Sequence, residues 1–345
     1  MSRAPRKPAT RKRKPQRRPP ETLALEWREW LAENLLGGAR PEAVLEALVE
    51  QGVPQKEARA RVDETLASPI FRAALGTARR AARYGQVLRL LSQQLATRTA
   101  PAVIERAEGL TAETFFERYY ATSTPVVWTD FTSGWPALER WQLAALADRF
   151  GELVVEVCEG READPDYDIN APKLLSKTTL AELIERTQAT SESNDFYMIA
   201  RNRNLEGPLR PLLDDLGDLH GVLEREALVG GCQLWIGPAG TVTPLHHDTS
   251  NIIFCQIAGR KRITIAPPVM TRLLTSPRAM YADLDPELEG ASLDGFRSVD
   301  LGPGESLFLP VGWWHHVRAL DASVSVAFVA FTRNNDVRWY TPGKL

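Results

Sequence analysis

Two pairs of adjacent histidines are conspicuous, because they account for four of the five histidines in the chain. The first pair lies in TPLHHD, residues 243–248, and the second pair, His315 and His316, directly follows two tryptophans. Imidazole and carboxylate groups are donors that bind transition metals in proteins. The two segments therefore predict a metal site assembled from distant parts of the sequence.

The His-x-Asp spacing is typical of a β-strand that presents two metal ligands. Side chains alternate faces along a strand, so His246 and Asp248 point the same way and His247 points elsewhere. With one distant histidine they complete a two-His-one-carboxylate triad, which leaves three coordination positions open for non-haem Fe(II) and O₂ chemistry. Alternation allows only one of His315 and His316 to face the metal, and parity alone leaves both open.

Lys261 is the cation that could accompany this site. It follows a glycine turn and begins a strand expected to lie beside the ligand strand. A buried lysine needs an anionic partner, because an unpaired buried charge is costly. The distal carboxylate of 2-oxoglutarate would serve, whereas the alternative for Lys261 is a solvated charge between Arg260 and Arg262.

Many short strands are expected around these residues. Gly and Pro turns separate several of them, and this pattern predicts a sandwich or barrel. The expected strands are 232–236, 241–245, 252–257, 262–266, 306–310 and 323–331. Upstream, expected helices at 112–120, 138–150 and 179–187 alternate with short β-rich runs at 125–128, 153–158 and 196–200.

The N-terminal part shows a helical pattern and a basic tail instead of short strands. Residues 22–98 predict four helices, and the apolar stripe of the first (Trp27, Trp30, Leu31) is expected to form a core, with partner or substrate binding as the alternative. Residues 1–20 contain nine Lys or Arg and no acid, so they predict a disordered basic tail. Such a tail either aids solubility or is an electrostatic arm for nucleic acid or an acidic protein.

Composition constrains the remaining classes. The formal net charge of −2 leaves about −11 outside the basic tail, which argues against nucleic-acid binding by the folded part. No apolar run is long enough for a membrane span, and no apolar segment follows the charged start, so neither a membrane protein nor a secretory signal is expected. Three cysteines without CxxC spacing fit reduced thiols, and we expect a cytoplasmic protein.

Two stretches carry a family resemblance. WIGPAGTVTPLHHDTSNIIFCQIAGRKRITIAPP (235–268) and LGPGESLFLPVGWWHHV (301–317) resemble the JmjC and cupin-like (cupin_8) Fe(II)/2-oxoglutarate-dependent oxygenases, in the branch of asparaginyl hydroxylases and bacterial cupin-like proteins. TPVVWTDFTSGWPALERW (124–141) is similar to the family's N-terminal section. The resemblance covers about 105–335.

The resemblance implies a mainly β fold with flanking helices (α+β). The core would be a double-stranded β-helix (cupin or jelly-roll barrel). The resemblance does not reach residues 1–100, where the helical pattern of the residues predicts a small helical domain before the barrel. The expected division is therefore a disordered basic tail (1–20), a small helical domain (21–100) and a JmjC/cupin-like oxygenase domain (101–345).

The resemblance also implies roles for individual residues. His246, Asp248 and His315 match the metal ligands. Lys261, Thr243 and Tyr197 match residues that contact 2-oxoglutarate. Two positions depart from the family pattern, because Ile252 and Ala327 stand where asparagine is common.

The expected function is that of an Fe(II)- and 2-oxoglutarate-dependent dioxygenase that hydroxylates a protein or peptide side chain, with O₂ as co-substrate. One alternative is an oxygenase acting on nucleic acid, held by the basic tail, or on a small molecule. Another alternative is a non-oxygenase metal-binding cupin, although such proteins usually show His-x-His followed shortly by Glu. A further alternative is an inactive scaffold. Histone-type demethylation uses the same iron chemistry, and the helices leave homodimerisation open.

Overall fold

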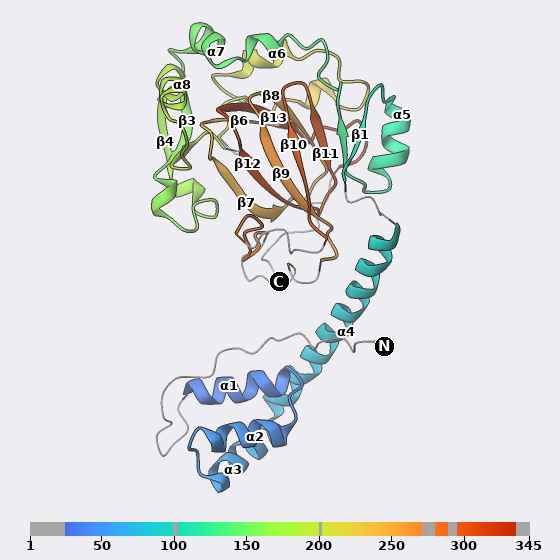
Figure 1. The fold of residues 1–345 in the computed structure, drawn as a ribbon, viewed down its shortest axis with the longest axis vertical. Coiled ribbons are helices and arrows are strands. Elements are labelled where there is room, and N and C mark those ends of the chain that lie inside the picture. Colours follow the sequence, from blue (N-terminus) through green and yellow to red (C-terminus); the bar gives the residue numbers. More distant parts are fainter. Residues whose placement is uncertain are drawn as a thin grey trace, which may run out of the picture. The chain divides into compact units, whose positions relative to one another are not determined.

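The computed structural model describes residues 25–98, 103–199, 202–270, 273, 280–288 and 295–335. The tail predicted at residues 1–20 lies outside them. The chain divides into two compact units, residues 1–90 and 91–345, with the boundary inside a long helix (Figure 1). No described helix has the length and apolar character needed to cross a membrane.

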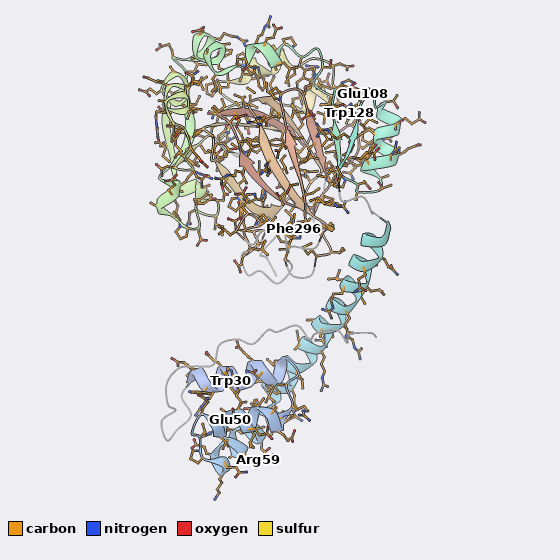
Figure 2. The ribbon with its side chains drawn as sticks, in the orientation of Figure 1. Trp30, Glu50, Arg59, Glu108, Trp128 and Phe296 are labelled. Carbon is orange, nitrogen blue, oxygen red and sulfur yellow. The ribbon has the colours of Figure 1, made fainter. Side chains whose placement is uncertain are left out.

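The first unit consists of helices. They are α1 (Leu25–Leu36), α2 (Pro41–Glu50), α3 (Gln55–Ala67) and α4 (Pro69–Arg98). The stripe of Trp27, Trp30 and Leu31 is buried, as its helical spacing predicts. Figure 2 labels Trp30 on α1. The two indoles pack edge to face with ring centroids 5.7 Å apart, so the N-terminal apolar residues serve a core.

The second unit is a jelly roll, as the sequence predicts. Eight strands form two sheets, in the orders β11-β8-β13-β6 and β10-β9-β12-β7. The strands are β6 (Cys232–Gly237), β7 (Val242–His247), β8 (Ile252–Ala258), β9 (Lys261–Ala266), β10 (Arg297–Leu301), β11 (Ser306–Leu309), β12 (Trp314–Ala319) and β13 (Ser323–Phe328). Apolar side chains from both sheets, among them Phe254, Ile263 and Leu307, form one cluster between them.

Shorter elements flank the jelly roll. β2 (Val126–Trp128) and β1 (Glu105–Ala107) extend the first sheet beyond β11, and β2 carries the buried Trp128 (Figure 2). A separate sheet contains β3 (Val154–Glu159), β4 (Leu175–Thr179) and β5 (Phe196–Tyr197). The flanking α-helices are α5 (Ala112–Phe115), α6 (Ala137–Arg140), α7 (Leu143–Phe150) and α8 (Leu180–Ala189).

The structure corrects three expectations. Residues 138–150 form two helices rather than one, because the chain turns at Trp141, whose buried indole N–H donates to Asp215 at 3.0 Å. Strand β10 was not predicted, since it is an edge strand whose side chains are mostly polar. Strand β9 pairs with β12, which carries His315, and β12 separates it from β7.

Candidate metal centre

His246 and His315 face each other across neighbouring antiparallel strands. They are paired residues in the register of β7 and β12, and their ring centroids lie 4.1 Å apart. Asp248 directly follows β7, and its Oδ2 lies 3.3 Å from His315 Nε2 and 4.0 Å from His246 Nε2. One donor atom from each residue lies within 4.8 Å of the others, so the fold brings the predicted triad together.

Two backbone carbonyls orient the imidazoles. Nδ1 of His246 lies 2.7 Å from the carbonyl oxygen of Pro244, and Nδ1 of His315 lies 3.0 Å from that of Trp313. A proton on each Nδ1 donates to the carbonyl and leaves the Nε2 lone pair for a metal. Each carbonyl belongs to the residue two positions before its histidine, a role that the sequence alone did not reveal.

The protonation states suit metal binding. Burial, together with the neighbouring His315, lowers the pKa of His246 to about 4, so this imidazole is neutral at pH 7. Burial opposes ionisation of Asp248, but the adjacent imidazoles of His315 and His246 outweigh it and lower the pKa of the carboxyl group to about 2. A neutral imidazole and an ionised carboxylate are the forms that coordinate a cation.

The other two histidines of the pairs point away from this centre. The His247 ring packs edge to face against Trp314, with centroids 4.7 Å apart. His316 is buried and does not line the cavity that contains His315. Strand parity left both His315 and His316 open as the distant histidine, and the structure places His315 beside His246 and Asp248.

Lys261 is buried in the same interior, with 1% of its surface exposed. Its Nζ donates to Tyr197 Oη at 2.9 Å and lies 5.5 Å from the centroid of the Phe254 ring. Among the described residues no carboxylate pairs with this ammonium group. Burial accordingly lowers the pKa of Lys261 to about 7. Such a site favours an incoming anion, which would compensate the desolvated charge.

The six predicted site residues line one cavity of about 440 Å³. Burial raises the pKa of the Tyr197 hydroxyl, which is therefore neutral when it accepts the bond from Lys261. Thr243 lies on β7 opposite Val317 of β12. A cavity of this size contains a triad at one place and, at another, an ammonium group that has no carboxylate partner among the described residues. It fits a small dianionic acid bound beside a metal.

Several cavity residues carried no recognisable signal in the sequence. They are Gln233, which lies on β6, and Asp168, Met280 and Tyr281, which lie outside the helices and strands. The two departures from the family pattern, Ile252 and Ala327, also line the cavity. These two substitutions relative to the family pattern therefore alter the shape and polarity of the pocket and leave the triad unchanged.

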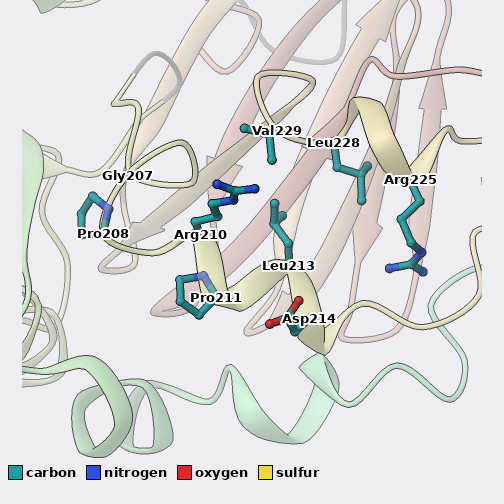
Figure 3. A pocket seen from close by; sticks show the side chains of 9 residues that line it. All are labelled: Gly207, Pro208, Arg210, Pro211, Leu213, Asp214, Arg225, Leu228 and Val229. Atoms are coloured by element: carbon teal, nitrogen blue, oxygen red, sulfur yellow. The ribbon is translucent and has the colours of Figure 1, made fainter.

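A larger hollow of about 670 Å³ lies elsewhere in the second unit (Figure 3). Its polar side chains are Arg210, Asp214 and Arg225, together with apolar residues such as Leu228. It contains one carboxylate and no imidazole. The donor set needed for a metal triad is thus found in the smaller cavity.

Comparison with known proteins agrees with this geometry. Residues 112–331 match the family described as Cupin-like domain. The chain is 32% identical over 245 residues to Lysine-specific demethylase JMJ30 of Arabidopsis thaliana, covering 65% of this chain and 54% of that protein. It is 27% identical over 245 residues to Jumonji C domain-containing protein 5 of Drosophila melanogaster, covering 67% and 60%.

A third relative is Lysine-specific demethylase 8 of Xenopus tropicalis, which is 28% identical over 239 residues, covering 63% of this chain and 50% of that protein. The chain spans about half the length of the curated relatives it matches. The similarity therefore covers only part of each relative.

Proposed function

We propose, on the premise that this chain belongs to the JmjC/cupin-like family of 2-oxoglutarate oxygenases, that it hydroxylates a side chain of a protein or peptide. Enzymes of this family use Fe(II) and 2-oxoglutarate with O₂. One observation carries the proposal: the triad of His246, Asp248 and His315 shares a cavity with a buried lysine that has no acidic partner among the described residues.

The residues present fit an iron ion and 2-oxoglutarate. Two neutral imidazoles and one ionised carboxylate are the donor set of non-haem Fe(II) oxygenases. Lys261 and Tyr197 would hold the distal carboxylate of 2-oxoglutarate, and the Thr243 hydroxyl would donate to it. When bound, the iron ion and 2-oxoglutarate would together supply the oxidising chemistry that inserts one oxygen atom of O₂ into a substrate C–H bond, with succinate and CO₂ as the other products.

The chain's own contribution is binding, orientation and exclusion of water. The carbonyls of Pro244 and Trp313 fix the two imidazoles, so the triad does not need to reorganise when it is filled. Apolar side chains such as Trp235 and Phe254 line the cavity and keep bulk water from the reacting atoms.

The protein-substrate class is supported by the relatives, three of whose names describe demethylases that act on lysine or arginine. Demethylation of such a side chain proceeds through hydroxylation, so both outcomes share one reaction type. The charge of about −11 outside the basic tail also favours a basic protein or peptide. An oxygenase that acts on nucleic acid is the competing outcome of the substrate test.

The chelate can be tested directly. We expect anaerobic addition of Fe(II) and 2-oxoglutarate to the full chain to give a visible charge-transfer band, and air to give succinate. Asp248→Ala and Lys261→Ala should each weaken the band, whereas Lys177→Ala, on an exposed strand position, should not. Absence of both the band and succinate in the wild type would refute the proposal. Peptides and RNA that gain 16 Da would then identify the substrate class.

A further inference from the structure

A second cluster of possible metal donors lies apart from the cavity. His316 follows His315 on β12, so its side chain points to the opposite face of the sheet. There it lies beside Asp285 and Glu287, which come from the described segment 280–288. One donor atom from each of these three residues lies within 4.8 Å of the other two.

The imidazole of His316 is buried, and its Nδ1 lacks a hydrogen-bond partner among the described residues. Only 2% of the residue is exposed, and its Nδ1 makes no hydrogen bond within the described part of the chain. Neither ring nitrogen appears in a hydrogen bond with a described residue. A buried polar group without a partner is costly, so such a group points to a ligand that completes it.

Each of the two carboxylates keeps one oxygen available. Oδ1 of Asp285 accepts the backbone N–H of Glu287 at 2.8 Å, and Oε2 of Glu287 accepts from Arg318 at 3.2 Å. The second oxygen of each group has no hydrogen bond from a described residue. Arg318 also binds Glu192, so the carboxylates of Glu287 and Glu192 share this one guanidinium group, whereas Asp285 has no ion pair with it.

We propose that Asp285, Glu287 and His316 form a second binding site for a divalent transition-metal ion, separate from the triad. One imidazole nitrogen with two carboxylate oxygens suits ions such as Mn(II) or Zn(II). Bonds of about 2.0–2.2 Å place donors no more than roughly 4.4 Å apart, so the cluster needs only a small contraction. The site does not depend on the proposed oxygenase reaction.

The segment that supplies the carboxylates also forms part of the cavity wall. Met280 and Tyr281 line the cavity, and the Tyr281 ring lies 5.6 Å from that of His246. The Ala282 amide donates to the carbonyl of Leu245 at 2.8 Å. An ion at the second site therefore joins this wall segment to β12, next to His315.

The test isolates the second site by removing the first. The full chain carrying Asp248→Ala is stripped with a chelator and titrated with Mn(II), and free Mn(II) is followed by electron paramagnetic resonance. We expect one ion per chain. Adding Asp285→Asn and Glu287→Gln should weaken binding at least tenfold, while Asp283→Asn, the same charge change in the same segment, should leave it intact.

Two results would overturn the proposal: no Mn(II) binding by the Asp248→Ala chain, or equal binding after the two cluster substitutions. Hydrogen exchange gives a second measurement, since Mn(II) should slow exchange of the Ala282 amide in the Asp248→Ala chain. Unchanged exchange would contradict the link to the cavity wall. Failure of the oxygenase proposal would instead appear in the wild type, as a missing 2-oxoglutarate-dependent band.

Discussion

The helical unit and the jelly roll bury different kinds of side chain. Among the side chains that the structure describes between residues 25 and 98, the buried ones are all apolar, and Leu48 and Val62 are completely covered. The jelly-roll unit buries charged and polar groups as well, including Lys261, His315 and Arg161. Because burial of a charge reduces stability unless a partner compensates it, the contrast separates a core that serves folding from an interior that serves chemistry.

Arg161 shows that a buried charge alone does not identify a site. Its guanidinium group donates to the carbonyls of Asn194 and Val242 and lies 3.4 Å from Asp168, so its charge is compensated within the fold. Lys261 has one hydroxyl partner and no acid among the described residues. The distinction between compensated and uncompensated burial is what assigns Lys261 to ligand binding.

Truncation of the apolar core in the helical unit should give the largest effect, which is a loss of stability without a loss of turnover. Leu48→Ala removes a fully buried side chain and should cost about 2–5 kcal/mol in the free energy of unfolding of the helical unit. Turnover per folded chain should not change. Urea unfolding followed by circular dichroism measures the loss, and Val49→Ala, at an exposed neighbour, should cost less than about 0.5 kcal/mol. Lower turnover at unchanged stability would break the contrast.

Lys261→Met should weaken binding of 2-oxoglutarate without reducing stability, the reverse of the result expected for Leu48→Ala. Loss of a buried, charged hydrogen bond of up to about 3 kcal/mol predicts a rise of roughly 100-fold in the KM for 2-oxoglutarate. The metal-free protein should be no less stable than the wild type, because an uncompensated charge has been removed. Succinate production at varied 2-oxoglutarate measures the effect, with Lys177→Met as control. A large loss of stability would show that Lys261 serves the fold.

The pH dependence of stability gives a third test. The pKa of Lys261 is about 7 in the folded chain and 10.5 in the unfolded chain, so between these values the unfolded state binds more protons. The free energy of unfolding of the metal-free protein should therefore rise with pH in this window, by up to about 1.4 kcal/mol per pH unit, and lose this gain as pH falls toward 7. Urea titrations from pH 7 to 9.5 measure the slope, which Lys261→Met should remove. An equal slope in both proteins would assign it to other groups.

The smallest effect is expected at Tyr197. Tyr197→Phe removes the hydroxyl that accepts from Lys261, and a neutral hydrogen bond of about 1 kcal/mol predicts roughly a fivefold rise in the KM for 2-oxoglutarate. Tyr119→Phe is the matched control, because it removes a hydroxyl bonded to Glu105 at 2.9 Å outside the cavity. A similar KM change in both variants would contradict a role for Tyr197 in the cavity.

The sequence by itself determined the features that depend on near neighbours. Helical spacing placed Trp27 and Trp30 in a core, and strand alternation put His246 and Asp248 on one face. The family motif indicated the jelly roll and the residue types of the cavity. These signals are legible because a helix or strand repeats over a few residues, so local order fixes which side chains share a face.

The tertiary structure alone decided how those faces meet. It put His315 rather than His316 opposite His246, and it brought the Tyr197 hydroxyl to Lys261 from 64 residues away. It also placed Tyr281 in the cavity wall and left Asp285 and Glu287 beside a buried imidazole. Strand pairing and register set these contacts, and they arise from the packing of the whole interior, which no short stretch of sequence encodes.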